Sequence, residues 1–132
     1  MLYELRIKVE KENKKDELKQ VIEHYITDAE LFADAEYTGF KEYDGKCDVI
    51  AIKRSPIREI VNDKDKDKPF FKATLIDVFV NDDGVEKENR YPVLVCAEDM
   101  KEANSIMEKY MQQGLGDLRL DGIVKTKILD VL

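Results

Sequence analysis

The chain has 132 residues, of which 43% are hydrophobic and 39% are charged, and its formal net charge is −7. This length suits one compact domain or two very small ones, and the hydrophobic content is sufficient for a buried core, which argues against global disorder. Because binding to a phosphate backbone needs clustered Lys and Arg, the acidic balance argues against direct nucleic-acid binding. A basic partner, or a locally basic site on an acidic body, is more consistent with it.

The first half of the chain predicts a hairpin, a helix and a further strand, from the spacing of its apolar residues. In chain order these are a half-buried strand at 3–10, a polar turn at 11–16, a second extended run at 21–26, a helix at 31–43 and a buried strand at 49–52. Ser55-Pro56 then predicts the start of a short helical turn.

The second half predicts the same order of elements after a charged segment. Residues 62–69 alternate in charge and end in proline, which indicates a solvated linker. The sequence at 81–84 is typical of a hairpin turn, and the residues from 100 to 111 form a broad apolar helical face. Asp99 with Glu102 fits a capping box at the start of this helix.

The two halves are also similar to each other in sequence. Residues 29–35 match 97–103 at a shift of 68, and residues 52–61 match 123–132 at a shift of 71. Self-similarity at a fixed period indicates a duplicated unit.

We therefore predict an α+β fold of two tandem ββαβ repeats, with a mainly antiparallel sheet, one helix per repeat and a pseudo-twofold axis. The predicted parts are a first repeat at 1–61, a charged linker at 62–69 and a second repeat at 70–132. Because a unit of about 60 residues is marginally stable alone, we expect the halves to share one core.

Most candidate chemical sites have a simpler structural interpretation. Asp63, Asp65 and Asp67 copy the first spacings of a calcium loop, but the turn glycine and the bidentate Glu of such a loop are missing. His24 is the only histidine, and no metal-ligand companion is spaced near it. The two cysteines, which are far apart, are typical of buried thiols in a reducing compartment. We predict no metal, no cofactor and no catalytic residue.

One set of basic residues remains as a candidate binding site. The residues that follow the last strand of each half are Lys53, Arg54, Arg58, Lys125 and Lys127. If a pseudo-twofold axis relates the repeats, these side chains converge on one anionic ligand or on an acidic partner surface. The alternative is ordinary solvation at strand ends, with local ion pairs to Glu59 and Asp130.

The strand predicted at 70–80 has apolar residues on both faces. Phe70, Ile76, Val78 and Val80 occupy the face that is charged in the corresponding strand of the first half. Such a face predicts contact with the other repeat or with a second subunit.

Three segments carry a resemblance over essentially the whole chain: residues 25–36, residues 52–54 and the closing Ile-x-Asp-Val at 128–131. With them the chain resembles an uncharacterised domain-of-unknown-function family of gut anaerobic bacteria and their phages. Leu31 and Ala33 depart from the small hydroxyl residues expected at the first helix start. The resemblance implies a phage or mobile-element setting, where small acidic proteins inhibit, sequester or tether, and it implies no catalytic residue.

From these observations we predict a non-enzymatic binding protein that contacts a protein partner and can self-associate. The first alternative is a protein that sequesters an anionic small ligand such as a nucleotide, and the last is a small hydrolase that depends on His24 or on a metal. DNA mimicry is a subsidiary alternative, since 22 basic residues interrupt the negative surface. The start of the chain lacks the pattern of a secretory signal and no apolar run approaches the length of a membrane span, so we expect a cytoplasmic location.

Overall fold

The structure is a computed structural model that describes residues 1–62, 67–114 and 116–132. Its elements in chain order are β1 (Leu2–Glu12), β2 (Leu18–Asp28), α1 (Phe32–Glu42), β3 (Asp48–Arg54), β4 (Ile60–Val61), β5 (Phe70–Val80), β6 (Glu86–Cys96), α2 (Met100–Gln112), β7 (Asp117–Lys125) and β8 (Ile128–Val131). The chain forms two compact units: unit 1 contains residues 1–55 and 127–132, and unit 2 contains residues 56–126. Each unit has one helix and one mostly antiparallel four-stranded sheet, which confirms the α+β class.

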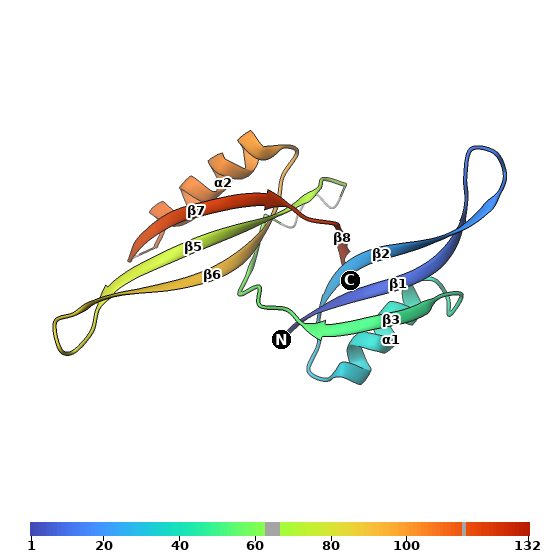
Figure 1. Ribbon diagram of the computed structural model, residues 1–132, viewed down its shortest axis with the longest axis horizontal. Helices are drawn as coiled ribbons and strands as arrows, with labels where there is room; N and C mark the ends of the chain where they lie inside the picture. Colours follow the sequence, from blue (N-terminus) through green and yellow to red (C-terminus); the bar gives the residue numbers. More distant parts are fainter. Residues whose placement is uncertain (63–66, 115) are drawn as a thin grey trace. The chain divides into compact units, whose positions relative to one another are not determined.

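Unit 1 is built on the hairpin of β1 and β2, in a sheet with the strand order β3-β1-β2-β8. Alternate residues of β1, including Leu5 and Ile7, are buried under α1, which lies across one face of the sheet (Figure 1). The helix comes close to the sheet at Gly39, where an added Cβ would lie 3.2 Å from Val49 Cγ2 and 3.3 Å from Ile7 Cδ1. Glycine therefore sets the packing distance at this point.

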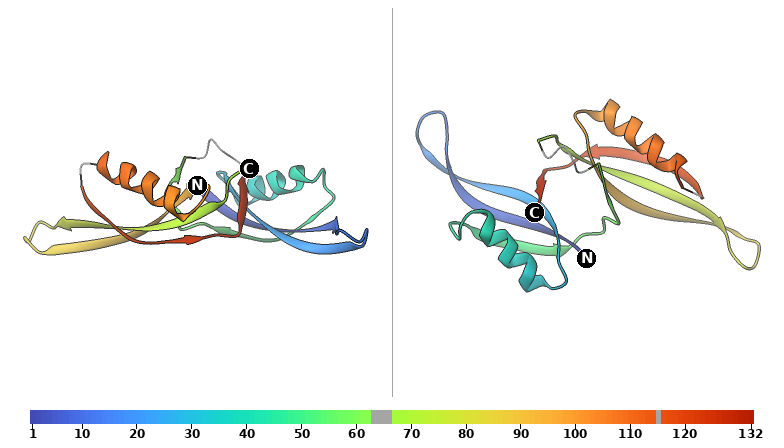
Figure 2. Two further views of the ribbon diagram at one scale, coloured as in Figure 1. Left: turned by 90° about the horizontal axis from the view of Figure 1, so that it is seen from above. Right: turned by 180° about the vertical axis from the view of Figure 1, so that it is seen from behind.

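Unit 2 is built on the hairpin of β5 and β6, in a sheet with the order β4-β6-β5-β7, and α2 lies against one face (Figure 2). The buried cluster between helix and sheet includes Leu75, Val93 and Met107. The predicted N-cap is confirmed, because the Asp99 side chain accepts a hydrogen bond of 2.8 Å from the Glu102 backbone N–H. The Glu102 carboxylate, however, lies 3.2 Å from Lys68 Nζ.

The two short strands, β4 and β8, lie where the chain crosses from one unit to the other. Each joins the sheet of the unit that the chain is entering. β4 follows β3 of unit 1 but pairs in parallel with β6 of unit 2, with Ile60 opposite Leu94. β8 follows β7 of unit 2 but pairs in parallel with β2 of unit 1, where the Leu132 N–H donates to the Ile26 carbonyl at 2.8 Å. The two units therefore exchange their closing strands.

This exchange explains why the compact units differ from the predicted repeats at 1–61 and 70–132. The predicted helical turn at Ser55-Pro56 is wrong: residues 55–59 have no helical structure and lead into β4. The Arg58 N–H donates to the Pro92 carbonyl at 3.0 Å, so this segment is already held along β6. Residues 63–66 of the predicted linker, and with them Asp63 and Asp65 of the calcium-like spacing, lie outside the described residues.

The two sheets share their strand order when β1 is matched to β5, β2 to β6, β3 to β7 and β8 to β4. Each also has one extra residue in its outer antiparallel strand, Ile50 in β3 and Asp121 in β7, at the same place in the pairing. The described residues form a separate buried cluster in each unit. Duplication, the pseudo-twofold axis and a shared core stay predictions.

The exchanged strand β8 should stabilise unit 1 through Ile128, whose side chain is only 9% exposed. We expect Ile128→Ala to lower the free energy of unfolding by about 2–4 kcal/mol, as other buried Ile→Ala changes do. The matched control is Leu129→Ala in the same strand, where the side chain is 50% exposed and the cost should stay below about 0.5 kcal/mol. Urea denaturation measures both, and equal effects would contradict the role given to β8.

Candidate functional site on unit 1

The face of the unit 1 sheet opposite α1, which we call the open face, carries alternate residues of β1, β2 and β3. Arg6 in β1 lies opposite His24 in β2, and Glu4 lies opposite Lys53 in β3. These side chains share one face because neighbours across an antiparallel pair point to the same side of the sheet.

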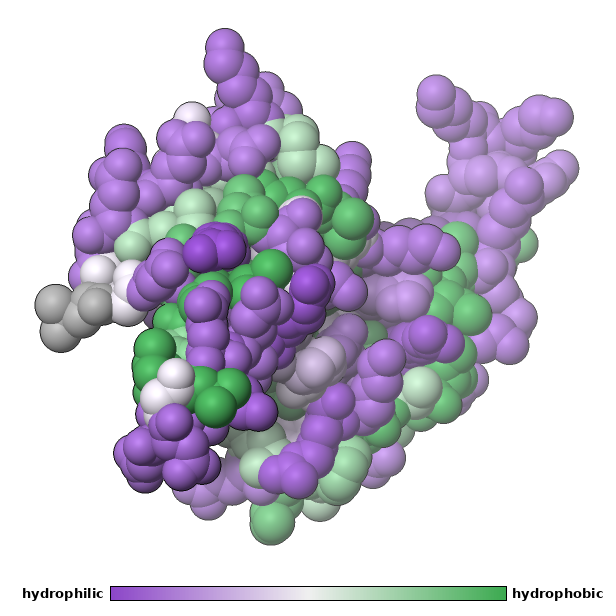
Figure 3. Space-filling model, turned by 60° about the vertical axis from the view of Figure 1, so that its left-hand side comes forward, coloured by the Kyte–Doolittle hydropathy of each residue, from purple (hydrophilic) through white to green (hydrophobic). Residues whose placement is uncertain are grey.

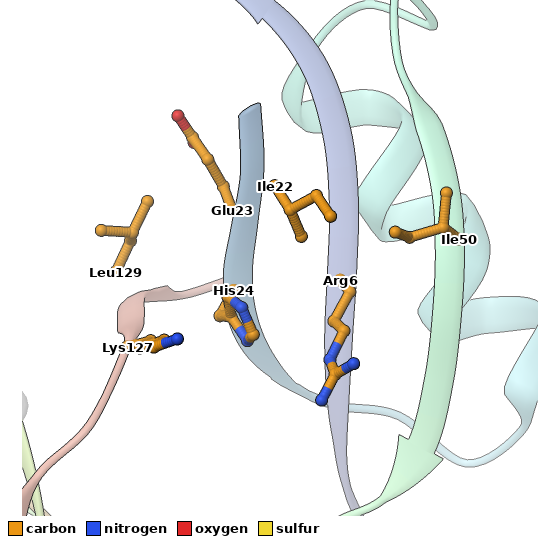
Figure 4. Close-up of a pocket in the computed structure, with 7 residues that line it drawn as sticks. All are labelled: Arg6, Ile22, Glu23, His24, Ile50, Lys127 and Leu129. Atoms are coloured by element: carbon orange, nitrogen blue, oxygen red, sulfur yellow. The ribbon is translucent and has the colours of Figure 1, made fainter. Parts of the chain in front are cut away.

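A depression of about 540 Å³ lies on this face (Figure 4). Its basic lining residues are Arg6, His24 and Lys127, and its aliphatic ones are Ile22, Ile50 and Leu129. A second cavity of about 210 Å³ shares Arg6 and His24 and is also lined by Lys53. We call Arg6, His24, Lys53 and Lys127 the basic surface.

Figure 4 shows the nitrogen-bearing ends of Arg6, His24 and Lys127 in the same part of the depression, with Ile22 and Ile50 beside them. Ile22 is 52% exposed, so a large aliphatic side chain lies at the surface here and not in the core. Glu23 also borders the depression, but its carboxylate points away from these nitrogen atoms (Figure 4). The arrangement can bind an anion at its basic side and an apolar group at its aliphatic side.

The pKa of His24 reflects the positive charges that surround the depression. Burial lowers the pKa of the imidazole below its usual value, and the positive charges of Arg6, Lys127 and Lys53 lower that pKa further. Glu4 acts in the opposite direction but does not reverse the shift. The imidazole is therefore neutral at pH 7, and a bound anion would favour its protonation.

Two features of the fold assemble this site. The extra residue in β3 is Ile50 itself, and β-bulges re-aim side chains in this way. Lys127 and Leu129 reach the open face only because the chain returns from unit 2 to unit 1 after Thr126. The strand exchange thus supplies two of the residues that line the depression.

Unit 2 has the same scaffold but a different surface at the corresponding positions. There Thr74 lies opposite Pro92, where unit 1 has Arg6 and His24, and Val124 replaces Lys53. An ion pair of 2.8 Å between Arg90 and Asp121 takes the places of Ile22 and Ile50. The fold therefore does not itself require the residues of the basic surface.

The five basic residues that the sequence nominated are divided between the units. Lys53 and Lys127 belong to the basic surface. Arg54 lies on the other face of β3, because it pairs with the buried Tyr3, and its guanidinium contacts the Met1 sulfur.

The other two nominated residues, Arg58 and Lys125, belong to unit 2. The Arg58 guanidinium lies 3.9 Å from the centre of the Tyr91 ring, and Lys125 is exposed at the end of β7. Convergence of all five side chains on one ligand stays a prediction.

Sequence reasoning missed Arg6 and His24 as members of one site. Arg6 is one polar residue of the half-buried strand predicted at 3–10, and His24 has no metal-ligand companion spaced near it in the sequence. The signal was present in the polar turn: Asn13 accepts backbone hydrogen bonds from Lys15 and Glu17, so the hairpin closes there and its register places Arg6 opposite His24.

The nominated apolar face of β5 is only partly available. Phe70 is fully buried, Ile76 and Val78 are partly buried, and Val80 is 68% exposed near the tip of the hairpin. In Figure 3, apolar groups on the face shown lie in separate clusters among polar side chains. Phe70 therefore cannot belong to an exposed interface, and a role for the other three stays a prediction.

A second polar cluster lies on the α1 side of β2. The hydroxyl of Tyr25 donates to Glu23 at 2.6 Å, the hydroxyl of Tyr43 donates to the same carboxylate, and Lys11 pairs with it. Burial raises the pKa of Tyr25 to about 12 and raises that of Tyr43 as well. Burial alone would also raise the pKa of Glu23, but these three donors lower it below 4.5.

The described residues show little other site chemistry. They contain no cluster of three or more His, Cys, Asp or Glu side chains that could hold a metal ion. Cys96 is buried, Cys47 is partly buried, and neither forms a disulfide; burial raises the pKa of the Cys47 thiol. In the part of the chain that the structure covers, neither helix is long and apolar enough to cross a membrane.

The fold and this surface define an α+β protein with two four-stranded sheets and a basic, aliphatic-rimmed depression on one of them. Over residues 1–132 the chain matches the model of the family described as Domain of unknown function (DUF4494), and it belongs to that family. This confirms the resemblance to an uncharacterised domain-of-unknown-function family. No curated protein and no solved structure matched the chain.

The basic surface predicts the titration of His24, which NMR can follow without assignment ambiguity because the chain has one histidine. We expect its pKa to lie below 6.5, and to rise in Arg6→Gln and in Lys127→Gln, since each variant removes a neighbouring positive charge. Lys72→Gln, on the sheet of unit 2, is the control and should leave the titration unchanged. If the His24 pKa does not change in Arg6→Gln, Arg6 and His24 do not belong to one basic surface.

The Glu23 cluster predicts a specific acid sensitivity. Because the folded-state pKa of Glu23 is lowered, its stabilising contribution is present above about pH 4.5 and is lost as the pH falls through the folded value. Between pH 7 and pH 3, wild type should lose more unfolding free energy than Glu23→Gln, which cannot titrate at this position. Parallel losses in the two proteins, measured by urea denaturation, would show that the cluster does not favour the carboxylate.

Proposed function

We propose that the protein is a non-enzymatic binding protein that holds an acidic segment of a protein partner on the basic surface of unit 1. The observation that supports this most is the gathering of Arg6, Lys53 and Lys127 around His24 on a chain whose net charge is −7. Clustering like charges without a partner is unfavourable, and a partner's carboxylates would relieve the repulsion.

The aliphatic rim favours a peptide over a free ion. Ile50 and Leu129 are each about half exposed beside the cations. Interfaces combine apolar contact, which supplies free energy, with charged groups that fix register and speed association. A segment with both acidic and aliphatic residues uses both parts of the depression.

A small anionic ligand is the second candidate function. The smaller cavity, about 210 Å³, brings Arg6 and Lys53 together beside His24, with Glu4 as its one carboxylate, and is large enough for a compact anion. A nucleotide panel in a thermal-shift assay separates this candidate from the first, because a ligand that binds only the folded state raises the melting temperature by mass action.

A small hydrolase would depend on His24, whose imidazole lines the depression. Its test is hydrolysis of ester and phosphoester substrates by wild type and by His24→Ala. We favour binding because the residues around His24 are chiefly cations and aliphatic side chains.

For its setting we propose a phage or mobile-element protein that acts in the cytoplasm, as the family resemblance and composition suggest.

Self-association through Ile76, Val78 and Val80 is compatible with this role. Val78→Asp should then dissociate an oligomer seen by light scattering without unfolding the chain.

Selection from a displayed random peptide library tests the proposed function. Wild type should enrich peptides that contain both acidic and aliphatic residues, and the double variant Arg6→Glu/Lys127→Glu should lose that enrichment, because reversal replaces attraction with repulsion. The matched control is Lys72→Glu/Lys101→Glu, which makes the same change in charge on unit 2 and should enrich the same peptides as wild type. Equal enrichment by all three proteins would overturn the proposal.

A further inference from the structure

The outer edge of β2 is only partly covered by β8. β2 extends from Leu18 to Asp28, whereas β8 pairs with it at His24, Tyr25 and Ile26. Among the described residues, no strand lies beside the edge of β2 that faces away from β1 between Leu18 and Glu23. We call this stretch the β2 edge.

At alternate residues of the β2 edge, the backbone N–H and C=O groups point away from β1, toward the side where no strand is described. The Ile26 carbonyl accepts a hydrogen bond from the Leu132 N–H, so Ile26 directs its backbone groups toward β8. Because these directions alternate along a strand, Ile22 and Gln20 direct theirs to the same side, beyond the start of β8. They can therefore pair with an added strand that continues the line of β8.

The corresponding edge in unit 2 has more charged side chains than the β2 edge. The stretch of β6 that matches the β2 edge is 86–91, in which Glu86, Lys87, Glu88 and Arg90 are charged, whereas the charged residues of the β2 edge are Lys19 and Glu23. Charged side chains at an edge strand prevent pairing with other chains. The β2 edge instead has Leu18, 66% exposed, and Ile22, which lines the depression.

We propose that the partner segment binds as an added β-strand along the β2 edge. This inference rests on the proposed function and states how the partner is held: backbone hydrogen bonds to Gln20 and Ile22 supply affinity, and the basic surface selects the sequence. Every second side chain of an added strand lies on the open face, toward Arg6 and Lys127. The fitting partner is an extended segment of another protein in which acidic residues alternate with aliphatic ones.

The probe is an acetylated and amidated peptide of alternating Glu and Val, as long as the β2 edge. NMR should show changes at His24, and the exchange of the Gln20 and Ile22 amides should slow by about tenfold or more at saturation. The amides of Glu88 and Arg90, at the matching positions of β6, are an internal control and should not change.

Backbone methylation tests the pairing without altering the protein. One version of the peptide carries N-methyl groups on its Glu residues and the other on its Val residues, so composition and charge are identical. Because only alternate amides of an added strand face β2, one version should lose binding and the other should keep it. Loss in both versions, or in neither, would overturn strand addition.

The remaining outcomes are distinct. If the peptide shifts His24 while the Gln20 and Ile22 amides exchange as before, the proposed function stands and strand addition fails. If the same amides become protected in concentrated protein without peptide, the edge pairs with a second copy, and the peptide inference fails. Absence of any response at millimolar peptide overturns it as well.

Discussion

The parallel pairing of the two short strands, β4 and β8, is the constraint on which the rest of this structure depends. Each strand closes the sheet of the unit that the chain is entering, so neither half of the sequence completes its own sheet. Ile57 and Ile128, which precede or begin these strands, are both buried. Losing either strand exposes apolar surface and leaves backbone groups without partners, so each unit depends on residues distant in sequence.

The same exchange contributes to the difference between the surfaces of the two units. β8 covers β2 only in part, and the segment that enters β8 brings Lys127 to the open face where Arg6 and His24 already lie. Burial lowers the pKa of His24, and the exchange contributes to the shift through Lys127, whose positive charge acts on the imidazole together with those of Arg6 and Lys53. The partly covered edge of β2 and the position of Lys127 in the basic surface are thus products of one topological feature.

The sequence predicted local elements well because they depend on local periodicity. The alternation at 3–10 and the helical spacing at 100–111 are properties of neighbouring residues, and both elements are present. It could not predict which sheet β4 and β8 join, because a short apolar strand fits any open edge equally well. Of the site, Lys53 and Lys127 were found, but Arg54 was grouped with Lys53 although the period of two already separates consecutive strand residues onto opposite faces.

The interiors of the two units differ in the second strand of each hairpin. Unit 1 has a buried carboxylate in β2, whereas unit 2 has none at the matching position of β6. Where unit 2 packs Tyr91 and Val93 beside its helix, β2 has Glu23 and Tyr25, a carboxylate and a phenol that need partners when buried. Those partners are present, so the cluster is stable but demands a fixed geometry of β2 relative to α1. Apolar packing would tolerate small shifts of the strand, whereas a hydrogen-bonded carboxylate does not. Unit 1 therefore fixes the position of the strand whose edge is only partly covered by β8, and the segment proposed to bind there would pair without first having to order β2.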